Sequence, residues 1–448
     1  MTDTFDLNYQ DKTLQQFKSN PYPNIPIAAS PKKDVALLYK NSLVTAYYHR
    51  YHRVLDDLSE CVILDLACGT GITTLTLAEA NPGAKIIATD ISPESLKIAE
   101  ERLNYHGFHN VEYHLLALEN IDQLKLDFDY INASDILYLL PDISLAFKQL
   151  ASVLKPKGII RGNLHSYYQR FPFYRSQELF SRMGLMDSNP GEIEIGIVRE
   201  FFVALKDTTD LKMRTRGKNN PQESEDEAIL MNYLFQNDKG FTVPQLLEFL
   251  ERAGLQLIDM VDWREWQLTD LFKEPDDLPA FLAMGFADLE LGEQLSLYEL
   301  IEPNKRLLDF WCGHPDPEPG NFIHSIDQND ENWRNIQIYL HPQLKTDEFK
   351  QEALSTDRPF PMNLKNHVPY LVPDVWLDRI LVNGLFAPLF EQSRSLGFLV
   401  DRWLKIQPVN PVTLMPTTET QTFVAMSEAV TDQEKLGVIL LDRTTRKN

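Results

Sequence analysis

The chain has 448 residues and a formal net charge of −22 at pH 7, with 43% hydrophobic and 24% charged residues. This balance is ordinary for a globular protein, and the length leaves room for two or three domains. Nucleic acid and anionic membranes are not expected as partners of such an acidic chain, because both carry negative charge. It contains no run of about eighteen apolar residues, so no membrane-spanning helix is expected. Its polar, acidic start does not resemble a secretory signal.

The cysteines indicate the compartment and bear on metal binding. Cys61, Cys68 and Cys312 are too few for a disulfide framework, which favours a reducing, cytoplasmic location. Cys312 is close to His314 and Asp316, but no second cluster of cysteine and histidine accompanies them. A metal site is therefore not expected.

Two segments precede the first predicted strand. Residues 1–34 are mostly polar, and three prolines within six residues favour an extended chain. Residues 35–58 are predicted to be helical, with apolar positions gathered on one side. The tyrosines of this helix either face a bound ligand or pack on the sheet; they are Tyr39, Tyr47 and Tyr48.

The most informative stretch is residues 62–71, Val-Ile-Leu-Asp-Leu-Ala-Cys-Gly-Thr-Gly. Its apolar start predicts a short buried strand, with Asp65 near the end. Gly69 and Gly71 lack a Cβ, so the backbone can turn tightly there and approach a ligand. Residues 72–80 carry apolar side chains at helical spacing, which predicts a helix directly after the turn.

A second strand is predicted over residues 85–89 and ends on Asp90. A carboxylate at this point can accept hydrogen bonds from both ribose hydroxyls of a nucleoside. Two details distinguish the pattern from a dinucleotide-binding turn: the acid Asp65 lies inside the motif, and Thr74 occupies the place of a third glycine.

After Asp90, predicted strands and helices alternate along the sequence. Ser92 and Pro93 predict a helix start, as N-cap and first helical residue. Alternation of this kind predicts an α/β fold, in which a doubly wound, mostly parallel sheet carries helices on both faces. Strands are predicted over residues 111–116, 128–133, 159–163 and 255–261, and helices over residues 141–154 and 242–253.

Residues 164–240 interrupt the alternation. An insert at this point would lie over the carboxyl edge of the sheet, where ligands bind in such folds. Its polar stretch, residues 214–227, predicts a loop. The insert therefore suggests a lid that shapes a binding pocket.

The composition changes again at about residue 270. Residues 270–300 are acidic and rich in leucine, which predicts one or two amphipathic helices. Strands over residues 336–340 and 437–441 and a helix over 375–390 follow. We therefore expect a C-terminal α+β domain of unassigned role at residues 270–448.

Residues 65–71 together with Asp90 resemble the class I S-adenosylmethionine-dependent methyltransferases. The resemblance covers residues 60–165 and, more loosely, 240–262. It implies S-adenosylmethionine as cofactor and a seven-stranded sheet, although no convincing seventh strand directly follows the last predicted one. A later segment is expected to supply it.

The resemblance also implies a domain order. An N-terminal arm and a cofactor-covering helix would occupy residues 1–60, and the methyltransferase domain residues 61–269. The acceptor of the methyl group would be a small molecule or a protein side chain. The sequence indicates neither its identity nor an oligomeric state.

Specific positions follow from the resemblance. Asp65 would face the ammonium and ribose end of the cofactor, and Ile91 the adenine. Ala117 replaces an acid that often accepts from the adenine amino group, so the N–H of Leu118 or the side chain of Glu119 would serve instead. The expected cofactor residues are Asp65, Ala67, Gly69, Gly71, Asp90, Ile91, Ala117, Leu118, Ser134 and Asp135.

For two of the expected cofactor residues and for the acceptor residues, the sequence allows more than one role. Ser134 and Asp135 would lie by the amino end of the cofactor, or Asp135 caps the following turn. His165 follows the fifth strand, where it is either a base near neutral pH or a structural hydrogen-bonding group. Further acceptor candidates are Tyr138, Tyr167 and Tyr168.

Two functions fit the sequence. One is an active methyltransferase, which the complete cofactor loop favours. The other is a catalytically weak or inactive S-adenosylmethionine-binding module that acts through its C-terminal domain, which Ala117 favours.

Overall fold

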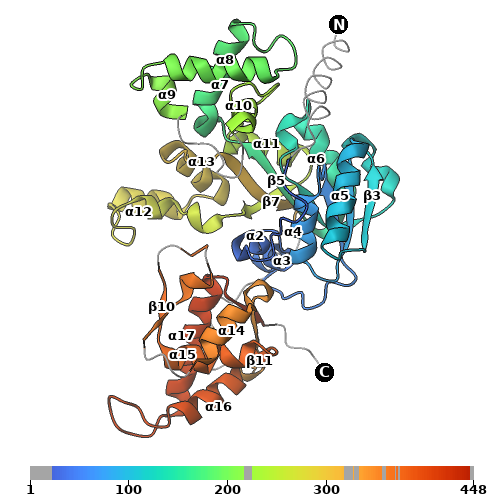
Figure 1. Cartoon of the computed structure of the whole chain (residues 1–448). Coiled ribbons are helices and arrows are strands. Elements are labelled where there is room, and N and C mark those ends of the chain that lie inside the picture. Colours follow the sequence, from blue (N-terminus) through green and yellow to red (C-terminus); the bar gives the residue numbers. More distant parts are fainter. Residues whose placement is uncertain are drawn as a thin grey trace. The chain divides into compact units, whose positions relative to one another are not determined.

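The computed structural model describes residues 23–215, 225–316, 326, 332–355, 360–368, 370–371 and 374–443. The predicted arm before residue 23 and the centre of the predicted loop at 214–227 lie outside these ranges. The chain divides into two compact units, each assembled from separate stretches of sequence (Figure 1). Unit 1 is Met1–Ala29, Cys61–Thr74 and Lys85–Pro315, and unit 2 is Ser30–Glu60, Leu75–Ala84 and Asp316–Asn448.

Unit 1 is built on a seven-stranded sheet with the strand order β3-β2-β1-β4-β5-β7-β6. The first five strands pair in parallel, and β7 runs antiparallel to both of its neighbours. The fold predicted from the alternation is thus confirmed. The strands are β1 (Val62–Leu66), β2 (Lys85–Asp90), β3 (Val111–Leu115), β4 (Phe128–Ala133), β5 (Leu154–His165), β6 (Gln256–Met260) and β7 (Leu307–Gly313).

β7 is the strand that the sequence placed in a later segment. It follows β6 only after α12 (Ala280–Ala287) and α13 (Leu291–Ile301). Arg161 of β5 pairs with Asp309 of β7 at 2.8 Å, which ties the late strand into the sheet. The sheet therefore continues beyond residue 270, where the sequence predicted a domain boundary. The composition change reflects two helices inserted before the last strand.

Helices cover both faces of this sheet. Successive side chains of a strand point to opposite faces. Leu64 and Leu66 therefore join the core formed with α6 (Ile143–Ser152) and α11 (Val243–Arg252), whereas Asp65 points toward α4 (Ile72–Ala80). Helix α4 begins in unit 1 and continues into unit 2. Unit 1 also contains α5 (Pro93–Tyr105), α7 (Tyr167–Arg182), α8 (Glu192–Ala204), α9 (Asp210–Thr215) and α10 (Glu225–Asn232).

The insert at residues 164–240 begins where β5 ends. It contains α7 to α10, which gather at one end of unit 1 in Figure 1. These helices have a small core of their own, made by residues such as Phe173, Phe180 and Val198. The insert is therefore a packed helical substructure at the carboxyl edge of the sheet, and not a simple loop.

Unit 2 contains a three-stranded sheet in the order β11-β8-β12. The predicted strands over 336–340 and 437–441 are confirmed as β8 (Gln337–Leu340) and β12 (Ile439–Asp442), which pair antiparallel. The predicted helix over 375–390 is shorter, because Trp376–Leu377 form β10. The other elements are α14 (Asp347–Leu354), α15 (Arg379–Leu385), α16 (Leu396–Ile406), α17 (Glu419–Lys435), β9 (Met362–Asn363) and β11 (Arg394–Ser395).

The helical segment before β1 also belongs to unit 2. It forms α2 (Val35–Lys40) and α3 (Leu43–Tyr51). The Tyr39 hydroxyl donates to the carbonyl of Gly437 at 3.2 Å, and the Tyr48 hydroxyl accepts from the N–H of Leu441 at 2.8 Å. Both tyrosines are buried. Packing within unit 2 therefore accounts for these two tyrosines, and the cofactor-covering role of the helical segment stays a prediction.

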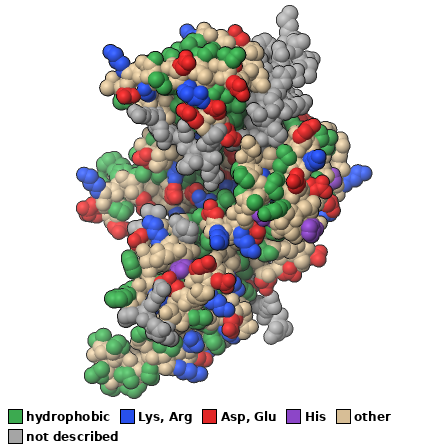
Figure 2. Space-filling view, viewed as in Figure 1, with side chains coloured by type: hydrophobic (Ala, Val, Ile, Leu, Met, Phe, Trp, Pro, Cys, Tyr) green, Lys and Arg blue, Asp and Glu red, His purple; other side chains and the backbone are tan. Residues whose placement is uncertain are grey.

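Figure 2 shows hydrophobic side chains gathered on the loop between α16 and α17. The side chains of Val412 and Leu414 at its tip are 88% and 77% exposed. Within the described ranges, no helix has the length and apolar character needed to cross a bilayer.

Candidate functional site

The turn between β1 and α4 has an unusual backbone. Ala67, Gly69 and Gly71 all have positive φ, at 53°, 53° and 83°. The N–H of Cys68 donates to the carbonyl of Thr89 at 2.9 Å, which fixes the turn against β2. A turn with alternating left-handed residues directs its N–H groups into a shared concavity, which suits a polar or anionic ligand.

Gly71 has a packing role that the sequence did not predict. A Cβ on Gly71 would lie 2.6 Å from the Cα and 2.7 Å from the Cβ of Ala99 in α5. The space beside this glycine is thus occupied by a helix and not by a ligand. Gly71 performs the close helix packing that dinucleotide folds assign to a third glycine.

Asp90 joins the end of β2 to the turn. Its Oδ2 accepts the N–H of Gly69 at 2.9 Å, and its Oδ1 accepts the N–H of Ser92 at 2.8 Å. Burial raises the pKa of this carboxyl. The backbone N–H of Ile91 also acts on this carboxyl. A carboxylate has about four accepting positions, so Asp90 keeps capacity to accept from a hydroxyl, such as one of a ribose diol.

Asp65 lies beneath the turn and is only 1% exposed. It accepts the hydroxyl of Thr74 at 2.7 Å and the side-chain amide of Asn132 at 2.8 Å. Burial raises its pKa to about 6. The sequence did not predict either partner, although Asn132 is conspicuous as a polar residue in an apolar strand. In this arrangement Asp65 supports the turn from inside the protein.

The residues predicted for the adenine lie at the ends of β2 and β3. The N–H of Leu116 donates to the carbonyl of Asp90 at 3.0 Å, which brings these strand ends together. The side chain of Ile91 is 46% exposed, so an apolar surface is available for a flat ring. Ala117 precedes a 3-10 helix that begins at Leu118, and the side chain of Leu118 is buried.

Asp135 follows β4 with a left-handed backbone, at φ 57°. Its N–H donates to the Asn163 side chain at 2.9 Å, and its Oδ1 accepts the hydroxyl of Tyr138 at 3.3 Å. Solvent reaches Asp135, yet the protein around it removes enough hydration to raise its pKa. Asp135 is thus an accessible carboxyl at the strand end where the cofactor's amino end is predicted. Ser134, next to it, donates to Asn132.

His165 is fully buried at the end of β5. Its ring stacks on Tyr138 at 3.8 Å between centroids, and its Nδ1 lies 2.6 Å from Oδ1 of Asp238. A carboxylate only accepts, so Nδ1 carries the hydrogen and Nε2 holds a lone pair. Burial and the charge of Arg170 lower the pKa of His165, which is therefore neutral at pH 7.

Asp238 was not predicted as a site residue. It also accepts from Arg170 at 2.5 Å and from Gln177 at 3.0 Å. Because Asp238 is 73 residues from His165 in sequence, only the fold of the insert brings them together. The cluster fixes α7 and the residues after α10 to the end of the sheet.

A pocket of about 510 Å³ lies beside this cluster. Its walls come from α7 and from residues 235–241. Lys239 contributes a polar side chain, whereas the side chain of Asp238 is fully buried within the wall. Of the predicted acceptor residues, Tyr167 lines the pocket, whereas His165 and Tyr138 lie behind Phe235. Five aromatic rings line it: Tyr167, Phe171, Tyr174, Phe235 and Phe241.

Comparisons with known proteins agree with the geometry. A family model described as a methyltransferase domain matches residues 57–206. An uncharacterized protein of Synechococcus sp. is 30% identical over 254 residues, which are 56% of this chain and 60% of that protein. Magnesium-protoporphyrin O-methyltransferase of Rhodobacter capsulatus is 39% identical over 100 residues, 22% of this chain and 43% of the enzyme. The chain thus matches less than two thirds of each relative.

One solved structure has a similar fold over most of the chain. PKMT2 from Rickettsia typhi has a TM-score of 0.58 and 14% identity, covering 94% of this chain and 78% of that one. At this identity the similarity concerns the fold. The matched family model and the turn at residues 67–71, called the cofactor turn below, agree with this fold. The chain therefore carries a methyltransferase domain of the class I S-adenosylmethionine-dependent family.

Proposed function

We propose that this chain transfers the methyl group of S-adenosylmethionine to a small-molecule acceptor that binds in the pocket of the insert. When bound, the cofactor supplies a methyl group activated by its sulfonium. The residues of the chain would align the two reactants and exclude water, which are the main protein contributions to such a displacement.

The cofactor residues fit this group. Asp90 lies at the end of β2, bonded to the turn through Gly69, and keeps capacity to accept from a ribose hydroxyl. Ile91 offers an exposed apolar side chain for the adenine. Asp135 is solvent-accessible after β4, where a carboxylate would attract the cofactor's ammonium group. The position of Asp90 at the strand end, bonded to the turn, is the observation that carries the cofactor assignment.

The acceptor site is inferred from a continuous series of contacts. The Tyr138 hydroxyl donates to Asp135, its ring stacks on His165, and His165 bonds to Asp238 in the pocket wall. Asp238 in the pocket wall and Asp135 at the expected amino end of the cofactor thus belong to one packed series, joined through the buried side chains of Tyr138 and His165. The volume and aromatic lining of the pocket suit a partly apolar small molecule with a few polar groups.

The named relatives support an acceptor of this size. By their names, they methylate magnesium-protoporphyrin and demethylmenaquinone or act in ubiquinone biosynthesis. The pocket and these names favour a small molecule over a protein side chain.

The insert would act as a lid. A lid that excludes water is ordered by its ligands, so hydrogen exchange in α7 and α10 should slow with S-adenosylhomocysteine, and slow further with a true acceptor. If the exchange is indifferent to both, the insert is a rigid structural element and the lid role is wrong.

We also infer a reducing, cytoplasmic location. Cys61, Cys68 and Cys312 form no disulfide, and two of them are buried. This arrangement is typical of proteins from reducing compartments.

Isotope labelling tests the proposed function. The protein is incubated with methyl-labelled S-adenosylmethionine and a cell extract separated into a small-molecule and a macromolecular fraction. Label should enter the small-molecule fraction with the native chain and not with Asp90→Ala. Label confined to the macromolecular fraction would contradict the small-molecule acceptor. An absence of labelling in both fractions, in a protein that binds S-adenosylhomocysteine, would favour the inactive binding module.

A further inference from the structure

Residues 23–27 form a non-helical strap whose carbonyls are held by side chains of the cofactor turn and of α5. Arg102 donates to the carbonyls of Ile25 at 2.7 Å and Pro26 at 2.8 Å. Four of the five strap carbonyls are bound in this way. The other two bonds run from the Thr70 hydroxyl to Pro23 at 2.7 Å and from His106 Nε2 to Ile27 at 3.0 Å.

The sequence of the strap explains its shape. Its two prolines have a fixed φ and lack an N–H group, so the segment forms no helix and offers mainly carbonyls to its neighbours. Two tight turns shape it: the N–H of Ile25 donates to the carbonyl of Pro23, and the N–H of Ala29 to that of Pro26, both at 3.0 Å. Exposure alternates along it: Pro23, Ile25 and Ile27 are partly buried, whereas Asn24 and Pro26 are exposed. One side of the strap thus lies on the protein and the other faces solvent.

Arg102 connects this strap to the cofactor turn. Its side chain is fully buried, and its Nε donates to the carbonyl of Thr70 at 2.9 Å. Thr70 lies between the two left-handed glycines of the turn, Gly69 and Gly71. One guanidinium therefore holds the strap with two donors and the turn with a third.

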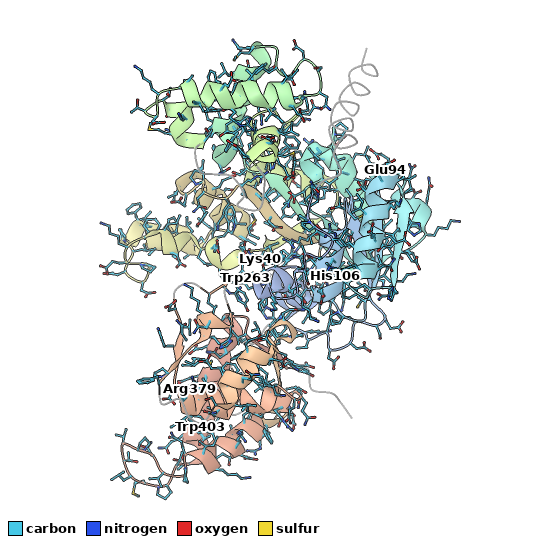
Figure 3. The ribbon with its side chains drawn as sticks, in the orientation of Figure 1. Lys40, Glu94, His106, Trp263, Arg379 and Trp403 are labelled. Atoms are coloured by element: carbon cyan, nitrogen blue, oxygen red, sulfur yellow. The ribbon has the colours of Figure 1, made fainter. Side chains whose placement is uncertain are left out.

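The same helix supports the turn at a second point, because Ala99 fills the space beside Gly71. Ala99 and Arg102 are three residues apart, so they lie on one face of α5. The exposed side chains of this helix, such as Glu94 near its start, lie away from that face. Figure 3 labels Glu94 and His106, which mark the two ends of the helix.

We infer that Arg102 is a positioning residue for the cofactor and that the strap is an unassigned part of the cofactor site. Arg102 holds the turn at residues 67–71 in its ligand-binding conformation and fastens the strap beside it. This inference rests on the proposed function, since it presumes that the turn binds S-adenosylmethionine. The nearest alternative is that Arg102 only stabilises the fold.

Calorimetric titration with S-adenosylhomocysteine tests the inference. Arg102→Met keeps an unbranched apolar side chain and removes all three bonds, so it should raise the dissociation constant tenfold or more. Thr70→Val removes only the strap bond of the hydroxyl, at similar volume, and should raise the constant about threefold. Lys97→Met is the matched control on an exposed position of α5 and should leave the constant unchanged.

Hydrogen exchange provides a second measurement, the effect of the ligand on the exchange rate of the strap. A purely structural role of Arg102 would leave this effect unchanged. In the native chain, S-adenosylhomocysteine should slow exchange at residues 24–29. In Arg102→Met this ligand-dependent slowing should be lost, while circular dichroism shows an intact fold. If Arg102→Met does not fold, Thr70→Val carries the test by the same two readings.

The outcomes separate this inference from the proposed function. If the native chain fails to bind S-adenosylhomocysteine, the proposed function is wrong and the inference falls with it. If the native chain binds and the folded Arg102 or Thr70 variants bind within twofold of it, the function stands and the strap is not part of the cofactor site.

Discussion

Gly71 and Ala99 approach so closely that a Cβ on the glycine would lie 2.6 Å from the Ala99 Cα. The obstructing atom is backbone, so it cannot move aside as a flexible side chain can. The cofactor turn is thereby supported by α5 as well as by the strand before it. The geometry of the turn depends on helix packing, and this dependence can be measured.

Gly71→Ala and Gly107→Ala form a matched pair. Both glycines have a left-handed backbone, at φ 83° and 82°, but a Cβ on Gly107 would meet no atom within 4 Å. The left-handed conformation costs an alanine roughly 1–2 kcal/mol, so Gly107→Ala should lose about that much unfolding free energy. Gly71→Ala adds the clash and should lose about 3 kcal/mol or more. Equal losses in urea denaturation would show that α5 yields without cost.

Thr74→Val removes one donor from the buried Asp65. A buried acceptor left without its donor costs about 1–3 kcal/mol. Because the pKa of Asp65 is about 6, its carboxylate is charged above that pH and needs the bond more. The loss of stability should therefore be larger at pH 7.5 than at pH 5. Thr73→Val on the same helix, where the side chain is only partly buried, is the control. A loss that does not change with pH would argue against a charged Asp65.

Glu299→Gln addresses a second buried acid. Glu299 is 2% exposed, accepts the N–H of Val243 at 2.9 Å and has a pKa raised by burial to about 7. The folded chain therefore binds a proton more tightly than the unfolded chain, and this group's contribution to stability falls as pH rises from about 4.5 to 7. The glutamine variant stays neutral.

Glu299→Gln should accordingly match the native stability at pH 5 and exceed it by about 1–2 kcal/mol at pH 8. Thermal or chemical denaturation at both pH values measures the difference. Glu302→Gln, at an exposed position of the same segment, should show no such trend. A native chain that is as stable as the variant at pH 8 would mean that Glu299 is ionised without penalty.

Asp90→Ala should weaken the binding of S-adenosylhomocysteine by a few kcal/mol. Hydrogen bonds to a charged group contribute roughly 1.5–3 kcal/mol each, and the variant also frees the N–H of Gly69 that now orders the turn. Asp90→Asn keeps one accepting oxygen and should bind between the alanine variant and the native chain. A dissociation constant that is unchanged in Asp90→Ala would exclude the ribose role.

Much of the sheet could be predicted because its signals are local. The apolar run before Asp65, the glycines after it and the cap formed by Ser92 each lie within a few residues of the structure they produce. The prediction at Asp90 also used position alone, since the carboxyl ends of parallel strands share one edge. Whether the predicted cofactor residues contact the ligand stays a prediction.

The missed features depend on contacts that are distant in sequence. Nothing near His165 announces Asp238, because the insert must fold before the two meet. The helices at α2 and α3 have an apolar side that indicates burial, but periodicity does not say against what. Thr74 was noticed only as a missing glycine, whereas its hydroxyl is the partner of Asp65.

The membership of α2 and α3 in unit 2 has a consequence for biosynthesis. Chains emerge from the ribosome with the N-terminus first, yet the Tyr48 hydroxyl bonds to Leu441, which is 393 residues later. Unit 2 therefore cannot complete its packing until the end of the chain is released, although its first helices are among the earliest residues made. A nascent chain would carry the aromatic side chains of these helices in an uncovered state throughout synthesis, so premature termination near residue 430 should leave a product that aggregates or recruits chaperones.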